Sequence, residues 1–171
     1  MHHLLSKLVS AASKLKLEDI SSLERNYFSE QILVSVYQMS SSGVQLTDEE
    51  RTIFGALIKE FIDDLDLCLF DLVLKFDPDR GSYNHILRSG IQFLLDNFKE
   101  FPVNETEVLG DSLKQIEESG NIEDLDEELI LLKDNPLRYV DWEYDDWESI
   151  CHPESDFLRP AGIPESHIWW S

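Results

Sequence analysis

The chain has 171 residues, of which 42% are hydrophobic and 29% are charged, and this ordinary globular composition excludes a wholly disordered chain. Its 14 lysines and arginines stand against 35 aspartates and glutamates, which gives a net charge of −21. Such a charge disfavours direct binding to nucleic acid or to an anionic membrane, and it favours a cationic partner.

The first part of the chain has the apolar spacing of helices. Leucines and alanines at three- and four-residue intervals predict a helix over residues 4–15. The sequence "SSLE" fits a capping box, in which Ser21 caps the next helix and Glu24 reaches back to it. Gly43 is expected to end that second helix in a left-handed conformation.

The longest apolar period lies between residues 47 and 76. Thr47 and the three acids after it are typical of a helix start. The second half is apolar nearly all round, because Leu67, Phe70 and Leu74 lie off the main apolar face. The pattern predicts one long helix at the buried centre of a bundle. A strand in the second half is the competing interpretation, which an interrupting aspartate and the unbroken helical period disfavour.

The sequence "DPDRGS" at 77–82 predicts a firm break, because it contains a proline and a glycine. With the preceding phenylalanine it resembles a seven-residue stretch in the core helices of bacterial sigma factors. The resemblance implies the same way of ending one helix and starting another, and no function. Ser82 is expected to cap a helix that runs to Phe98. Shorter helices are expected over 108–116 and 122–132.

These segments predict an all-α fold, with a single helical bundle-like domain of about six helices and an irregular C-terminal tail. Residues 1–136 would form the helical domain. Residues 137–171 would form an acidic, tryptophan-rich tail that packs on this domain or extends from it. The chain has no signal-peptide pattern, no apolar run long enough to span a membrane and only two cysteines. We therefore expect a soluble, cytoplasmic protein that does not bind membranes.

The tail contains the strongest recognition signal, "DWEYDDWESICHPE" at 141–154. Aromatic side chains often anchor interfaces, and carboxylates around them steer a basic partner into place. The predicted partner-binding residues are Asp141, Trp142, Glu143, Tyr144, Asp145, Asp146, Trp147 and Glu148. In the alternative interpretation, Trp142, Trp147, Trp169 and Trp170 only pin the tail to the bundle, and the acids face water.

Other polar groups give weaker signals. Cys151, His152 and His167 have zinc-ligand chemistry, but their spacing fits no known zinc finger, so a packed cysteine and surface histidines are expected. Carboxylates near one side of the long helix, namely Glu60, Asp63, Asp64 and Asp71, are expected to form a solvated face. We predict no catalytic residue, no metal site and no cofactor.

The sequence thus predicts a non-enzymatic, acidic protein-binding module with a basic protein as its partner. In its sharpest form this is an inhibitor or immunity-type protein that neutralises a toxin or nuclease by charge mimicry. One alternative is an adaptor or regulatory subunit that docks a larger assembly through the tryptophan-rich tail. A third is a metal- or cysteine-dependent hydrolase that uses Cys151, His152 and His167.

Overall fold

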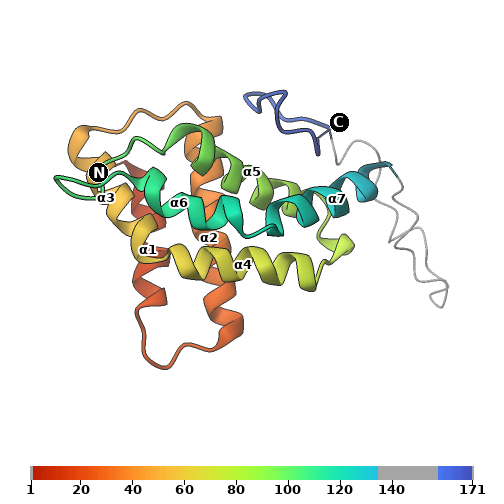
Figure 1. Cartoon of the computed structure of the whole chain (residues 1–171), viewed down its shortest axis with the longest axis horizontal. Coiled ribbons are helices and arrows are strands. Elements are labelled where there is room, and N and C mark those ends of the chain that lie inside the picture. The colour runs from red at the N-terminus through yellow and green to blue at the C-terminus, as the bar shows by residue number, and fades with distance from the viewer. Residues whose placement is uncertain (1, 135–157, 171) are drawn as a thin grey trace.

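The computed structural model describes residues 2–134 and 158–170, and within these ranges the chain is helical and has no β-strand (Figure 1). The predicted all-α fold is confirmed. None of the helices in this part of the chain is both long enough and apolar enough to cross a membrane. The helices are α1 (His3–Leu15), α2 (Ser22–Ser41), α3 (Asp48–Glu60), α4 (Ile62–Leu74), the short 3-10 helix η1 (Pro78–Arg80), α5 (Ser82–Asn97), α6 (Leu109–Glu118) and α7 (Asn121–Asp134).

Local signals set several helix ends as predicted. Ser21 and Glu24 form the reciprocal hydrogen bonds of a capping box at the start of α2. Thr47 forms the same arrangement with Glu50 at the start of α3. Gly43 follows α2 with a φ of 64°, the left-handed conformation that favours glycine. These ends depend on residues three or four positions apart, which explains why the sequence alone predicts them.

The helices pack around a pair formed by α1 and α2, which run side by side (Figure 1). On this pair, α5 packs along α2, and α4 lies against both α2 and α7. The α3 helix contacts α1 and α6. The last two helices, α6 and α7, each contact both α4 and α5.

The predicted single helix over residues 47–76 is wrong, because the chain forms two helices that meet at Phe61. This residue leaves helical geometry, with φ −111° and ψ 21°, although backbone hydrogen bonds continue on both sides of it. The two halves share α6 as a neighbour, but α3 also packs against α1, while α4 also packs against α2 and α7. Tertiary packing therefore breaks a helix in which no proline or glycine marks the position.

The second half of that segment is also less buried than predicted. Leu67, Phe70 and Leu74 are 49%, 45% and 64% exposed, so one face of α4 is apolar and open to solvent. The most buried helix is instead α5, which buries ten residues against five in α4. Its start also differs from the prediction, because Gly81 and not Ser82 is the N-cap residue and no side chain caps the helix.

One hydrophobic cluster includes buried residues of all seven α-helices and the end of the chain. Ile163, Trp169 and Trp170 belong to this cluster together with Leu33 and Leu94. Residues 158–170 therefore pack on the bundle. The predicted domain boundary at 136/137 lies outside the described residues.

Two helix glycines allow close contacts that a side chain would prevent. A Cβ atom on Gly90 of α5 would lie 2.5 Å from the carbonyl oxygen of Leu33 in α2. A Cβ atom on Gly55 of α3 would lie 2.3 Å from the carbonyl oxygen of Pro102. Both oxygens belong to backbone, which cannot move aside as a side-chain end can.

We expect Gly90→Ala to lower the free energy of unfolding by about 2 kcal/mol, because overpacking outweighs the roughly 1 kcal/mol by which alanine favours a helix. Urea denaturation followed by circular dichroism measures this change. Gln92→Ala, on the same helix at a half-buried position, is the control and should change stability by less than about 0.5 kcal/mol. An unchanged or higher stability of Gly90→Ala would contradict the close approach of α2 and α5.

Candidate functional site

Residues 158–170, called here the docked segment, lie against α5 without regular secondary structure. His167, Trp169 and Trp170 are buried, and Ile168 between them is exposed. Three large side chains at the end of the chain thus point into the protein. They meet at one residue of α5.

That residue is Ser89, which is fully buried. The indole N–H groups of Trp169 and Trp170 lie 3.1 and 2.9 Å from its hydroxyl oxygen. Nδ1 of His167 lies 3.1 Å from the same oxygen. An indole N–H can only donate, so the two tryptophans occupy both lone pairs of the hydroxyl oxygen. The hydroxyl hydrogen then has one acceptor, Nδ1 of His167.

This arrangement requires a neutral His167 that carries its proton on Nε2. A protonated ring would direct a third donor at an oxygen whose two lone pairs are already occupied. The pKa of His167 is lowered to about 4, chiefly by burial, and the positive charges of Arg88 and Arg159 act in the same direction. Asp96, whose carboxylate lies 4.0 Å from Nε2, and Asp126 act in the opposite direction. The imidazole is therefore neutral over the physiological pH range.

Arg88 supports the docked segment from the next position on α5. Its Nε and NH2 groups donate to the two carboxylate oxygens of Asp126 on α7, at 2.6 and 3.0 Å. Its guanidinium carbon lies 4.1 Å from the ring centroid of Trp169, which is a cation–π contact. Lys133 of α7 donates to the carbonyl oxygen of Ile168 at 3.2 Å. The docked segment is thus bonded to both α5 and α7.

The docked segment also reaches the C-terminal end of α2. Gly162 has a φ of 85°, and a Cβ atom there would lie 2.8 Å from the carbonyl oxygen of Ser41. Only glycine combines this backbone conformation with this close contact. The segment therefore contacts three helices through sequence-specific features.

The group formed by Ser89, His167 and Asp96 has the residue types of a catalytic triad, but its geometry serves docking. The hydroxyl oxygen of Ser89 is buried and accepts two indole N–H groups, so no substrate carbonyl can approach it. Cys68 is also a poor nucleophile, because burial and the charge of Glu30 raise the pKa of its thiol to about 12. Neither group can attack a substrate.

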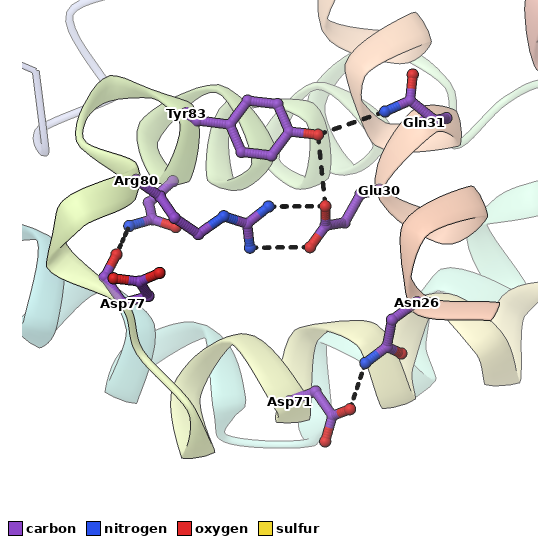
Figure 2. A network of polar contacts seen from close by, with 8 residues as sticks. Asn26, Glu30, Gln31, Asp71, Asp77, Arg80 and Tyr83 are labelled. Atoms are coloured by element: carbon purple, nitrogen blue, oxygen red, sulfur yellow. Dashed lines mark hydrogen bonds and ion pairs between the residues drawn. The ribbon is translucent and has the colours of Figure 1, made fainter. Parts of the chain in front are cut away.

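A second polar group joins α2, η1 and α5 around Glu30 (Figure 2). Arg80 donates to both carboxylate oxygens of Glu30, at 2.9 and 2.7 Å, and its guanidinium group stacks on the ring of Tyr83. Tyr83 also donates to Glu30, and its pKa rises to about 12 because of burial and the carboxylate charge. Nearby, Asn26 donates to Asp71 of α4. Asn26, Glu30, Asp71 and Arg80 line a pocket of about 330 Å³, but their polar groups already bond to one another or to Tyr83.

Cations in the described part of the chain are mostly engaged in ion pairs with the protein's own carboxylates. Nine of them lie within 4.0 Å of an aspartate or glutamate oxygen: Lys16, Arg25, Arg51, Lys59, Lys75, Arg80, Arg88, Lys99 and Lys114. Exposed acids are frequent where α6 leads into α7, at Glu118, Glu123, Asp124 and Glu127. Each ion pair neutralises one carboxylate, so the excess of acids over bases leaves many exposed carboxylates without a cation.

The predicted partner-binding residues, Asp141, Trp142, Glu143, Tyr144, Asp145, Asp146, Trp147 and Glu148, lie outside the described residues, as do Cys151 and His152. The alternative in which tryptophans pin the tail is confirmed for Trp169 and Trp170. The prediction that His167 lies at the surface is wrong, because its imidazole is buried and bonds to Ser89 of α5.

The acids of the long helix segment also differ from the prediction of a solvated face. Asp64 pairs with Arg25, Asp71 accepts from Asn26, and only Glu60 and Asp63 are exposed. The carboxylates of Asp64 and Asp71 thus connect α4 to α2. Among residues 2–134 and 158–170, no three histidine, cysteine, aspartate or glutamate side chains lie close enough together to hold a metal ion.

Sequence reasoning missed Ser89 and Arg88. A signal was present, because "NHILRS" places four polar residues, Asn84, His85, Arg88 and Ser89, along one side of an otherwise apolar helix. Such a stripe normally faces water. Here all four residues are buried, and Ser89 and Arg88 are covered by the docked segment.

We expect Ser89→Ala to lower the free energy of unfolding by about 3 kcal/mol, because two indole N–H groups and one imidazole nitrogen lose their buried partner. Urea denaturation measures the loss. Ser29→Ala is a matched control, since Ser29 is equally buried but its hydroxyl bonds only to a backbone oxygen of its own helix, that of Arg25. Equal effects of the two substitutions would show that Ser89 does not organise the docked segment.

We also expect stability to fall by about 2 kcal/mol between pH 7.5 and pH 5 because of His167. The pKa of His167 is about 4 in the folded protein against an ordinary value of 6.5. The folded state therefore binds fewer protons than the unfolded state in this window, and acidification favours unfolding. Urea denaturation at each pH measures the change, and His167→Gln should remove most of it.

Carboxylates do not obscure this test. Hydrogen bonds hold the pKa values of Glu24, Glu50 and Glu107 below their ordinary value of 4.5, so the stability that these groups contribute is lost only at lower pH. A pH profile that is identical for His167→Gln and the unaltered protein would exclude the histidine as its cause.

No protein-family model, no curated protein and no solved structure matches this chain, so its function must be argued from its own residues.

Proposed function

We propose that this protein is a non-enzymatic, acidic binding protein that neutralises a basic protein partner, in the manner of an inhibitor or immunity protein. Residues 141–148 would be the recognition element, with Trp142 and Trp147 as anchors and the neighbouring carboxylates as partners for lysines and arginines. A basic toxin or nuclease that normally binds a polyanion has the matching surface.

The distribution of charge carries this proposal. The chain has 21 more acids than bases, and nine of its 14 bases are engaged in ion pairs within the fold. Few cations therefore remain to offset the exposed carboxylates. Such a surface attracts a basic protein over long distances and repels nucleic acid, which is the behaviour that charge mimicry requires.

The attachment of the recognition element gives a second line of support. Before it, α7 packs on α4 and α5. After it, the docked segment is fixed through Ser89 and Arg88. The helix before residues 135–157 and the docked segment after them are thus both packed on the bundle, and Lys133 of α7 bonds directly to the docked segment. Anchoring both ends of a binding segment lowers the conformational entropy lost on binding.

The adaptor alternative has less support. It relies on tryptophans that dock a larger assembly, yet Trp169 and Trp170 are buried in this protein's own core. The hydrolase alternative relied partly on His167, whose Nδ1 is occupied by Ser89. Both observations favour a module whose docked segment is structural and whose recognition depends on residues 141–148.

The proposal predicts a salt-sensitive complex with a basic protein. The immobilised protein should retain one stoichiometric basic partner from a lysate of its source at about 50 mM salt and release it at about 500 mM, because screening shortens the range of the attraction. Mass spectrometry identifies the partner. Retention that does not depend on salt would support the adaptor alternative instead.

Charge reversal tests the recognition element. Asp145→Lys together with Asp146→Lys should slow association with the captured partner about tenfold and change dissociation less, because steering acts on the encounter. Surface plasmon resonance separates the two rates. Glu18→Lys with Asp19→Lys is the matched control, since it changes the net charge equally at exposed positions of the α1–α2 connection. Equal slowing by both pairs would reduce the proposal to a general charge effect.

A further inference from the structure

A pocket of about 300 Å³ lies between the C-terminal ends of α2 and α5 and the chain that connects α2 to α3. Ser40, Arg51, Asn97, Phe98 and Phe101 are among the residues that line it. Its volume is at the lower end of the range for small-molecule sites. No aspartate or glutamate lines it, which is notable in a chain with 35 carboxylates.

Two polar groups of this pocket have hydrogen-bonding capacity that the described residues do not use. Nε of Arg51 and the hydroxyl oxygen of Ser40 are both buried and have no hydrogen-bond partner. The nearest carboxylate to Arg51 is that of Asp48, 4.0 Å from NH1 and on a fully exposed side chain. An ion pair of that length and exposure contributes little. Buried donors without a partner are uncommon in native proteins and require a cause.

The Glu30 pocket provides an internal comparison. There the guanidinium group of Arg80 is paired through both terminal nitrogens with Glu30, and Tyr83 bonds to the same carboxylate (Figure 2). Its arginine already holds a carboxylate that belongs to the protein. Arg51 has the same side-chain chemistry and no such carboxylate at bonding distance.

The walls of the pocket define the rest of the ligand. The guanidinium carbon of Arg51 lies 4.6 Å from the ring centroid of Phe101, which is a cation–π contact. Phe98 and Phe101 pack edge to face, with ring centroids 4.9 Å apart. A planar guanidinium fork matches a carboxylate, and the two rings match an apolar body.

We propose that this pocket binds a small organic carboxylate with an apolar body. The carboxylate pairs with Arg51 and accepts from the hydroxyl of Ser40, and the apolar part lies against Phe98 and Phe101. This activity would be a second one, in addition to the proposed protein-binding function.

Benzoate is the probe, because it combines a carboxylate with one aromatic ring. Benzamide is its uncharged analogue, and inorganic phosphate is an anion without an apolar body. Titration of the 15N-labelled protein with each, followed by the Arg51 Nε–H resonance and by the amides of Val44, Gln45 and Asn97, gives the dissociation constants. We expect saturable shifts with benzoate, and at least about tenfold weaker binding of benzamide and of phosphate.

Variants assign the effect to the pocket. Arg51→Gln should weaken benzoate binding at least about tenfold, and Ser40→Ala should weaken it several-fold. Lys59→Gln is the matched control, because it removes a positive charge from the same helix outside the pocket and should leave the dissociation constant unchanged.

Three outcomes would overturn the proposal. Shifts that do not saturate would exclude a site. Equal binding of phosphate would indicate a general anion effect without use of the aromatic walls. Equal loss in Arg51→Gln and Lys59→Gln would show that net charge and not the guanidinium fork is responsible.

Discussion

The arrangement of this protein depends on the hydroxyl group of Ser89, which has as many hydrogen-bond partners as its atoms allow. Two indole donors and one imidazole acceptor leave it no further capacity, and all three come from the last residues of the chain. The consequences extend beyond the contact itself. The imidazole must be neutral and in one tautomer, Trp169 must lie over Arg88, and Arg88 is in turn held by Asp126 of α7. One buried serine thus fixes the place on α5 at which His167, Trp169 and Trp170 dock.

Positive and negative side chains have different places in this molecule. Positive side chains connect helices, as Arg25 does between α2 and α4, Arg80 between η1 and α2, and Arg88 between α5 and α7. Negative side chains outnumber positive ones, 35 against 14, so carboxylates that have no cationic partner make the exterior anionic. Arg51 differs from these arginines, because its guanidinium group stacks on Phe101 and its ion pair with the exposed Asp48 is 4.0 Å long. The two proposals follow from this division: the acidic exterior suits a basic protein, and the pocket at Arg51 suits a small anion.

Local chemistry allowed much of the fold to be predicted, and distant contacts limited the rest. Both ends of α2 and the start of α3 were predicted correctly because Ser21, Gly43 and Thr47 act on residues only a few positions away. The break at Phe61 was missed because it accompanies packing of α3 against α1 and of α4 against α2 and α7, which no short motif encodes. The contact between His167 and Ser89 was missed for the same reason, since the two residues are 78 positions apart in the sequence. A polar stripe on α5 was the available signal, and it became informative only once the buried tryptophans that cover it were known.

Hydrogen exchange of the tryptophan indole N–H groups tests the docking of the chain's end most directly. Nuclear magnetic resonance resolves the indole signals, and Trp169→Phe and Trp170→Phe assign the two that bond to Ser89. Because both N–H groups are buried and donate to one hydroxyl, the account predicts that they exchange only when the protein unfolds and that their protection matches the global free energy of unfolding. Exchange at the rate of a free indole, in a protein whose α5 amides remain protected, would contradict the docking of residues 158–170 on the bundle.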